Sequence, residues 1–239
     1  MASAIVRRAI STIASDAILY GDSVGLGDHC VVASQAVIGG DPQDLKYRGE
    51  KSSVIIGSHC KIGGKVTVNK GTTGGGLSTV IGSHCELKYM SHVGHDCTLG
   101  DRVVVGDYSC LAGHVILDDN VRVGERVGIL QRVHVGKGAA VLARCALDCD
   151  LVPFGVAQGN RAYLKGFVSG ALSPEEEQIL LDLLLPPLPV PLPLSLKERA
   201  MQEKQQHARR PSNFADVLQF IIDKTTKGRP LCLPRPPSP

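Results

Sequence analysis

The feature that most constrains this chain is a repeat of six residues. From residue 81 onward, every sixth residue is a branched aliphatic through twelve consecutive blocks. These residues are Ile81, Leu87, Val93, Leu99, Val105, Leu111, Leu117, Val123, Ile129, Val135, Val141 and Leu147. Shorter runs of the same kind occur between residues 26 and 38 and between residues 56 and 68. A fixed period held for so long is typical of a solenoid protein.

A period of six predicts a parallel β-helix, in which three hexapeptides form one coil of eighteen residues. The first residue of each block points inward and stacks on the residue eighteen positions away. Glycine often takes the second position, where we expect a tight corner with positive φ. Coils of this type wind left-handed, against the usual right-handed rule. The predicted fold class is therefore mainly β: a left-handed parallel β-helix with a short α-helical C-terminal region.

The same period accounts for most of the cysteines. The fifth position of a block also faces inward and takes small or apolar residues, and Cys30, Cys60, Cys85, Cys97 and Cys145 all occupy it. A free thiol behaves there as a small apolar side chain. The chain contains no C-x-x-C pair. We therefore predict buried thiols rather than zinc ligands or a disulfide framework.

The chain divides into four predicted parts. Residues 1–16 are expected to be a transit peptide, and hence a mitochondrial address, or else the ragged N-terminus of a cytoplasmic protein, because the first fifteen residues carry two arginines and no acid. Residues 17–165 form the β-helix. Residues 166–228 form a disrupted α-helical domain with a proline-rich linker at 186–193, and residues 229–239 form a disordered tail.

Composition excludes two classes of function. The formal net charge of +3 is too small to indicate a nucleic-acid-binding protein. No apolar run reaches the roughly 18 residues that a membrane-spanning helix needs.

Two polar, glycine-rich segments at residues 39–55 and 69–80 interrupt the coils. We expect them to be loops extruded from a corner of the solenoid, where such proteins carry their functional residues.

The C-terminal region carries signals for helix starts. Ser173 with Glu176, and Ser195 with Glu198, have the spacing of capping boxes, in which each side chain satisfies a backbone donor of the other. A third helix is amphipathic. Its expected apolar side is formed by Phe214, Val217, Leu218 and Ile221.

A group of histidines lies near the centre of the repeat, in "HVGHDC" and "LAGHV". Eighteen-residue stacking places His95 beside Gly113 and then Gln131, with His114 one residue from that column. None of these residues is an inward opener, so we expect a polar patch on the outer face. Three interpretations remain open from spacing alone: zinc ligands formed by His92, His95 and His114, an imidazole base with a pKa of about 6.5, or histidines without a role.

Five segments resemble a known family. They are "GGDPQDLKYRGE", "VNKGTTGGGLSTVIG", "HVGHDCTLGDR", "LAGHVILDD" and "PFGVAQGNRA". Together they resemble the UDP-N-acetylglucosamine O-acyltransferases that begin lipid A biosynthesis, across roughly residues 20 to 170. The resemblance implies transfer of an (R)-3-hydroxyacyl chain from acyl carrier protein to the 3-hydroxyl of UDP-N-acetylglucosamine.

The resemblance also implies roles for individual residues. His95 matches the general base, Asp96 the carboxylate that supports it, and Gly113 the backbone donor to the oxyanion. The residues that match substrate contacts are Gln43, Asp44, Lys46, His92, His114 and Gln131. The family is a homotrimer in which the first extruded loop meets the histidines across a subunit seam, and it needs no metal and no cofactor.

The chain departs from the family in several places. Leu130 stands where the family has a histidine, Arg161 replaces another, and a basic pair that helps to hold the nucleotide is missing. Leu142 and Ala143 fall where family members carry small residues that limit the length of the acyl chain. These departures leave a second interpretation: a non-catalytic relative that trimerises as a scaffold or partner subunit.

Overall fold

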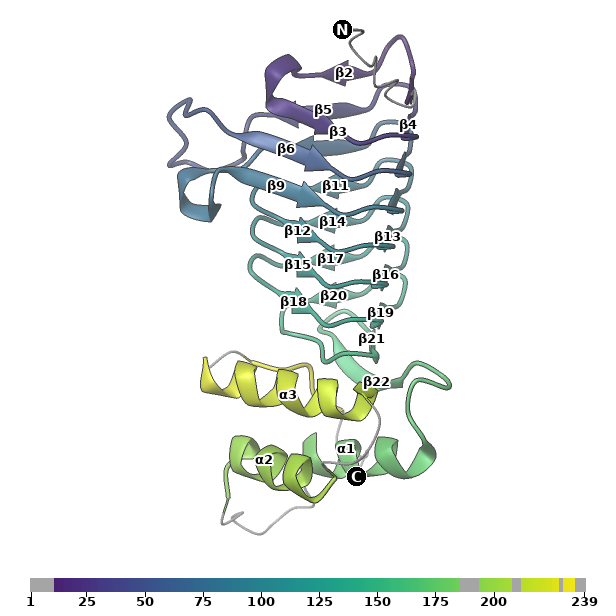
Figure 1. Ribbon diagram of the computed structural model, residues 1–239, viewed down its shortest axis with the longest axis vertical. Coiled ribbons are helices and arrows are strands. Elements are labelled where there is room, and N and C mark those ends of the chain that lie inside the picture. The colour runs from purple at the N-terminus through teal and green to yellow at the C-terminus, as the bar shows by residue number, and fades with distance from the viewer. Residues whose placement is uncertain (1–10, 185–193, 208–211, 228–229, 235–239) are drawn as a thin grey trace, which may run out of the picture.

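The computed structural model describes residues 11–184, 194–207, 212–227 and 230–234 of the chain, and a three-sided solenoid dominates it (Figure 1). Strands eighteen residues apart pair in parallel, so that Glu86 pairs with Val104, Val104 with Arg122, and Arg122 with Ala140. This register confirms the parallel β-helix predicted from the six-residue period.

The strands form three sheets, one on each side of the solenoid. Sheet A contains β1 (Thr12–Ile13), β4 (Val31–Val32), β7 (Lys61–Ile62), β10 (Glu86–Leu87), β13 (Val104–Val105), β16 (Arg122–Val123), β19 (Ala140–Val141), β21 (Gly155–Gln158) and β22 (Tyr163–Phe167). Sheet B contains β2 (Ile18–Leu19), β5 (Val37–Gly40), β8 (Thr67–Asn69), β11 (His92–Val93), β14 (Cys110–Leu111), β17 (Gly128–Ile129) and β20 (Ala146–Leu147). Sheet C contains β3 (Val24–Leu26), β6 (Ser53–Ile56), β9 (Ser78–Ile81), β12 (Thr98–Leu99), β15 (Ile116–Leu117) and β18 (His134–Val135).

The core consists of aliphatic columns from the first and fifth positions of the blocks. Leu87, Val105 and Val123 stack in one such column and are fully buried or nearly so. The five cysteines predicted to face inward are buried, and all eight cysteines are free thiols. Three of them donate to a glycine carbonyl of the next coil: the Cys30, Cys60 and Cys85 thiols each do so at 3.1 Å.

The glycines of the second position have a different role from the one expected. Positive φ occurs at the fourth position instead, for example at His84 (59°), Asp96 (60°) and Arg102 (57°). A Cβ on Gly82 would lie 2.6 Å from the Gly100 carbonyl oxygen, and one on Gly106 would lie 2.4 Å from that of Gly124. The prediction of a positive-φ corner at these glycines was wrong. They are required because neighbouring coils approach too closely for a side chain.

The solenoid begins earlier than residue 17. Strand β1 at Thr12–Ile13 pairs in parallel with β4. The transit-peptide prediction rests mainly on residues 1–10. These lie outside the described residues, and the transit peptide therefore stays a prediction.

Three helices lie beyond the last coil: α1 (Pro174–Leu184), α2 (Leu196–Gln206) and α3 (Ser212–Thr226) (Figure 1). Both capping boxes are present. The Ser173 hydroxyl accepts from the Glu176 N–H at 3.2 Å, and the Ser195 hydroxyl accepts from the Glu198 N–H at 3.3 Å. The predicted apolar side of α3 is buried.

The proline-rich linker at 186–193 lies outside the described residues. None of the helices in the described ranges has the length and apolar character needed to cross a membrane.

The C-terminal tail packs on the solenoid where it is described. Leu231 bridges to Asp150 and Pro234 to Leu164, while the Cys232 N–H donates to the Asp150 carbonyl at 2.7 Å. The Cys232 side chain is fully buried. The prediction of a disordered tail was therefore wrong for residues 230–234. The last coil has no following coil to pair with, and the tail satisfies backbone groups that would otherwise be left without partners.

Candidate active site

All the predicted site residues except His92, which lies in β11, come from one corner of the solenoid, where the chain passes from sheet B to sheet C. One extruded loop connects β5 to β6, and the other connects β8 to β9 and contains a 3₁₀ turn at Thr73–Gly75. His95, His114 and Gln131 lie in the equivalent connections of three successive coils. The two loops protrude on the same side of the solenoid in Figure 1. The repeat thus brings together segments that are far apart in the sequence.

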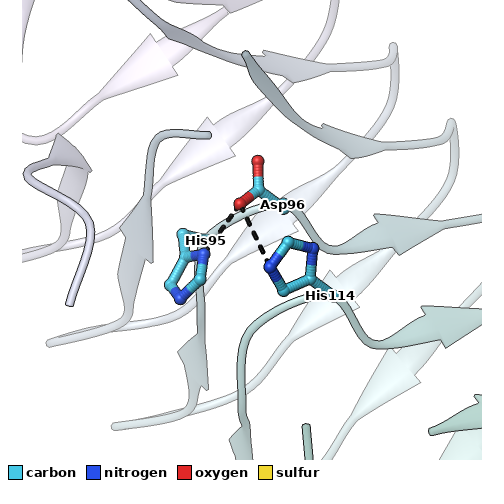
Figure 2. A group of neighbouring side chains, drawn as sticks. All are labelled: His95, Asp96 and His114. Carbon is cyan, nitrogen blue, oxygen red and sulfur yellow. Dashed lines mark hydrogen bonds and ion pairs between the residues drawn. The ribbon is translucent and has the colours of Figure 1, made fainter. Parts of the chain in front are cut away.

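His95, Asp96 and His114 form a compact cluster at this corner (Figure 2). The His95 Nδ1 lies 2.8 Å from the Asp96 Oδ2, and the His114 Nε2 lies 3.6 Å from the same oxygen. The two imidazole rings meet edge to face, with centroids 5.1 Å apart. Only 4% of His95 and 7% of Asp96 are exposed, so this part of the expected outer-face patch is buried, whereas His114 is half-buried and Gln131 is exposed.

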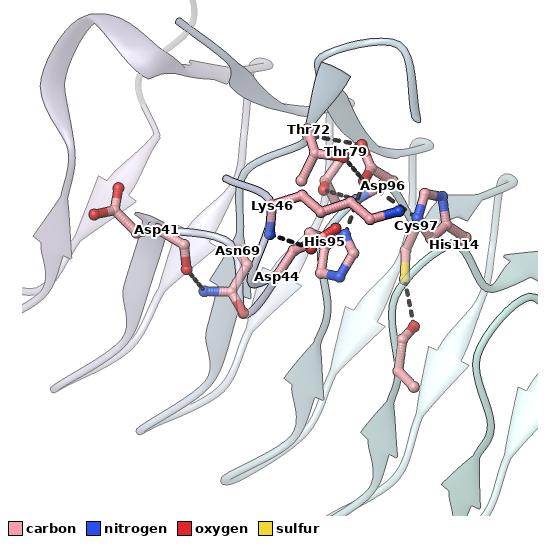
Figure 3. A network of polar contacts seen from close by, with 11 residues as sticks. Asp41, Asp44, Lys46, Asn69, Thr72, Thr79, His95, Asp96, Cys97 and His114 are labelled. Atoms are coloured by element: carbon pink, nitrogen blue, oxygen red, sulfur yellow. Dashed lines mark hydrogen bonds and ion pairs between the residues drawn. The ribbon is translucent and has the colours of Figure 1, made fainter. Parts of the chain in front are cut away.

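The second extruded loop buries this cluster and holds Asp96 in place (Figure 3). Thr72 donates to Asp96 twice, from its N–H to Oδ1 and from its hydroxyl to Oδ2, both at 2.6 Å. The Asp96 N–H in turn donates to the Thr79 hydroxyl at 2.9 Å. A Cβ on Gly75 would lie 2.1 Å from the Asp96 carboxyl carbon. The loop therefore packs directly on the carboxylate and fixes its orientation.

The electrostatics favour an ionised Asp96 and neutral side chains at His92 and His114. Burial raises the pKa of Asp96, but hydrogen bonds from His95 and Thr72 outweigh it, so that the pKa lies below its usual value. Burial lowers the pKa of His114, and the Asp96 charge only partly offsets that effect. Burial also lowers the pKa of His92, with a further contribution from His95. His92 and His114 are therefore neutral at pH 7 and Asp96 is charged.

A cavity of about 490 Å³ opens beside the cluster. Five of the predicted residues line it, namely Gln43, His92, His95, Gly113 and Gln131, together with Cys110 and Leu130. A Cβ on Gly113 would lie 2.5 Å from the His95 Nε2. This nitrogen of His95 therefore lies against the Gly113 backbone, opposite the nitrogen that contacts Asp96.

Hydrogen bonds and charges position further predicted residues around the cavity. His92, which lines it, is anchored by a 2.7 Å hydrogen bond between its Nδ1 and the Thr67 hydroxyl. The charge of Asp44 acts on His114, which places the first loop near the cluster. The Asp44 Oδ1 accepts from the Lys46 N–H at 2.8 Å (Figure 3). This loop was expected to meet the histidines across a subunit seam. It already meets them within a single chain, because both leave the same corner.

Three atoms of the cluster have the spacing of a metal site. One ligand atom each from His95, Asp96 and His114 lie within 4.8 Å of one another. His92, which the zinc interpretation included, is not part of this group. Both Asp96 oxygens already accept hydrogen bonds from Thr72, and the His95 Nδ1 contacts one of them. This geometry orients His95 and aims its Nε2 away from the carboxylate, as in an acid–base pair.

The sequence did not identify the residues that support this pair. Thr72, Gly75 and Thr79 lie in "GTTGGGLST", which was predicted to be a loop and was part of the family resemblance but was given no role for its individual residues. Cys110 lines the cavity without having been singled out. Its outward position in β14, opposite His92 in β11, follows from the eighteen-residue register and could have identified it.

Comparisons with known proteins return one group of acyltransferases. No protein-family model matches the chain. Over 206 residues the chain is 34% identical to the acyl-[acyl-carrier-protein]–UDP-N-acetylglucosamine O-acyltransferase of Paracoccus denitrificans, covering 83% of this chain and 76% of that protein. The Helicobacter pylori protein of the same name is 32% identical, with 84% and 74% covered. The Nautilia profundicola protein is 41% identical, but the match spans only 54% of its length.

Solved structures extend the comparison to the fold. A crystal structure of UDP-N-acetylglucosamine acyltransferase has a TM-score of 0.74 at 27% identity, covering 95% of this chain and 98% of that one. The Bacteroides fragilis enzyme has a TM-score of 0.79 at 24% identity, covering 93% and 86%. These likenesses confirm the left-handed form of the predicted β-helix.

Proposed function

Because the chain belongs to the family of acyl-[acyl-carrier-protein]–UDP-N-acetylglucosamine O-acyltransferases, we propose that it transfers an (R)-3-hydroxyacyl chain from acyl carrier protein to the 3-hydroxyl of UDP-N-acetylglucosamine. This reaction is the acyl transfer of lipid A biosynthesis. The observation that carries the proposal is the buried His95–Asp96 pair at the mouth of a cavity lined by five residues that match the family.

His95 acts as the general base. Asp96 accepts from the His95 Nδ1, so that the Nε2 is the nitrogen that takes the proton from the sugar hydroxyl. Attack of this hydroxyl on the thioester carbonyl forms the new ester, the carbon–sulfur bond breaks, and the sulfur of acyl carrier protein leaves as a thiol with the proton that the His95 imidazolium returns. Thr72 supports the arrangement because its two hydrogen bonds keep Asp96 ionised and fixed. Asp96 in turn stabilises the imidazolium that forms during the reaction.

The Gly113 backbone donates to the oxyanion. Within the described part of the chain, the Gly113 N–H donates no hydrogen bond, and the residue packs against the His95 Nε2. A fixed donor next to the base can meet the negative charge that develops on the thioester oxygen. No side chain is tolerated there, which agrees with a role for the backbone itself.

The remaining residues bind the substrates. His92, Gln43 and Gln131 line the cavity and offer hydrogen bonds to the acceptor sugar. His114 of the cluster, with Asp44 and Lys46 beside it (Figure 3), contacts the sugar and the acyl chain. The active assembly is a homotrimer with acyl carrier protein as the donor partner. Exposed apolar side chains on the solenoid, such as Ile55 and Ile116, are consistent with subunit contacts.

The test is an acyl-transfer assay with labelled UDP-N-acetylglucosamine and a series of (R)-3-hydroxyacyl carrier proteins. We expect product from the wild type and a loss of at least about 10²-fold in His95→Ala, since a general base contributes that much. His84→Ala is the matched control, because His84 is exposed at another corner and leaves the cavity intact.

The alternative is the non-catalytic scaffold. Leu130 brings an exposed leucine to the cavity wall in place of the family's histidine, and this departure favours the alternative. A folded protein that gives no product with any acyl chain length would support the interpretation as a non-catalytic scaffold. Leu130→His separates the two interpretations further, since an active enzyme should then show a lower KM for the nucleotide.

A further inference from the structure

A second group of histidines lies at the corner where the chain passes from sheet C to sheet A. Three successive coils carry the same Gly-x-His-Cys sequence there, at residues 27–30, 57–60 and 82–85. The histidines His29, His59 and His84 stack one above another, and we call them the imidazole ladder. The acyltransferase site occupies a different corner and uses none of them.

The ladder has regular geometry. The ring centroids of His29 and His59 are 4.8 Å apart, and so are those of His59 and His84. The rings are nearly parallel, at 19° and 2°. The backbone beneath them is fixed, because the His59 N–H donates to the Asp28 carbonyl and the His84 N–H to the Ser58 carbonyl, each at 2.8 Å. The side chains themselves are exposed, so the rings can rotate.

The ring nitrogens of the ladder are available to a ligand. Among the described residues, no hydrogen bond or ion pair engages them. The next residue of the column, Arg102, turns away and donates from its Nε to the Asn120 Oδ1 at 2.8 Å. Asp28, the neighbour of His29, is exposed and adds a negative charge to this corner. The corner therefore offers imidazole nitrogens beside a carboxylate.

We propose that the imidazole ladder binds one divalent transition-metal ion, with Cu²⁺ bound most tightly, between two adjacent imidazoles. A metal–nitrogen bond is about 2.0–2.1 Å long, so two opposed ligand nitrogens lie roughly 4 Å apart. In a parallel stack the coordinating lone pairs lie in the ring planes and do not face one another, so a shared ion requires both exposed rings to rotate about their side-chain torsions until a nitrogen of each points at it. The 4.8 Å step between ring centroids keeps the two nitrogens within reach of one ion after that rotation. Imidazole suits copper, and Cu²⁺ stands highest in the affinity order of the divalent series.

The spacing also limits the stoichiometry. His29 and His84 are two coils apart, too far for one ion to reach both. Either possible pair contains His59, so the ladder holds one ion per chain and His59 is always a ligand. Removal of His59 therefore abolishes the site, whereas removal of His29 leaves the pair formed by His59 and His84.

The experiment is a titration of untagged protein with CuCl₂, followed by calorimetry and by the nitrogen couplings in the electron paramagnetic resonance spectrum. We expect one ion per chain coordinated by two imidazoles. His59→Gln should weaken binding by at least about tenfold, and His29→Gln should retain it. Unchanged acyl transfer in His59→Gln would show that the variant is folded.

Three results would overturn the proposal. Wild-type protein that binds no Cu²⁺ would exclude a site at the ladder. Equal binding by the wild type and His59→Gln would show that the ion lies elsewhere. Loss of binding in His114→Gln but not in His59→Gln would assign the ion to the cluster of His95, Asp96 and His114. The first two of these results leave the proposed acyl transfer untouched.

Discussion

The position of the His95 imidazole depends on the absence of a side chain at Gly113. A Cβ there would lie 2.5 Å from the His95 Nε2, so Gly113→Ala must push the imidazole away from the cavity. A displacement of about 1 Å at a reacting group can cost about 10² in rate, and we expect a kcat at least that much lower with the fold retained. Gly25→Ala is the control, because the nearest atom to its Cβ is 3.9 Å away. Equal activity of the two variants would contradict the placement of the Nε2.

The charge of Asp96 can be measured through His114. Burial lowers the pKa of His114 and the Asp96 carboxylate raises it, so Asp96→Asn removes only the raising effect. The pKa of His114 should therefore fall further below its usual value of about 6.5. NMR titration of the imidazole protons, assigned with His114→Gln, measures this shift, and Asp119→Asn serves as a control. A rise in the pKa of His114 would contradict this electrostatic account.

The same Asp96→Asn variant should lose about 10²–10⁴-fold in kcat, because the tautomer of His95 is no longer fixed.

At the scale of elements, the loop between β8 and β9 determines whether the cluster is buried. Gly75 approaches Asp96 so closely that Gly75→Ala must lift this loop and break the bonds from Thr72. The adjacent Gly74→Ala has room, since its nearest contact is the Thr72 hydroxyl at 3.6 Å. We expect Gly75→Ala to lose most of its activity and Gly74→Ala to keep it. Comparable activity in both would mean that the loop does not hold Asp96 during the reaction.

The sequence predicted the elements whose spacing is periodic. The inward columns, such as Val93 and Leu99, follow from the period of six, and so does the alignment of His95 with Gly113. The period determines which way a side chain points but not whether another segment packs over it. His95 was therefore expected on a solvent-exposed face. It is buried because Thr72 and its neighbours fold over it, and the conformation of a glycine-rich loop leaves no periodic trace in the sequence.

The tail around Cys232 escaped prediction for a similar reason. Its residues "PLCLP" are apolar but too short to show a period, and their prolines indicated disorder. They pack because the last coil leaves the Asp150 N–H and C=O without a following strand, and Pro230 and Cys232 supply the partners. Such pairing depends on the end of the solenoid, which no local pattern describes.

The helix α3 is attached to this end through a buried ion pair. The Lys224 Nζ lies 3.2 Å from the Asp150 Oδ2, and the Asp150 side chain is fully buried. Lys224→Met keeps the aliphatic stem but removes the cation beside the buried Asp150 carboxylate, which still accepts from the His134 N–H. Removing one partner of a buried ion pair costs about 3–5 kcal/mol. We expect a lower melting temperature and faster proteolysis after the last coil. Lys227→Met, at an exposed position of the same helix end, should change neither. A melting temperature unchanged by Lys224→Met would show that Asp150 is satisfied by its other contacts.

For the whole molecule, the central question is what covers the apolar side chains of the first extruded loop. Leu45 is 95% exposed, between two residues, Asp44 and Lys46, that match substrate contacts in the family. The proposed homotrimer provides a cover, and burying one leucine contributes about 1.5–3 kcal/mol. Threefold symmetry repeats that contribution at each of three identical interfaces. Leu45→Ser should therefore weaken the trimer far more than Met201→Ser, a change at a half-exposed methionine on α2. Sedimentation velocity over a dilution series measures both. Wild-type protein that remains a monomer at every concentration would refute the trimer, and a trimer equally stable in both variants would place Leu45 outside its interface.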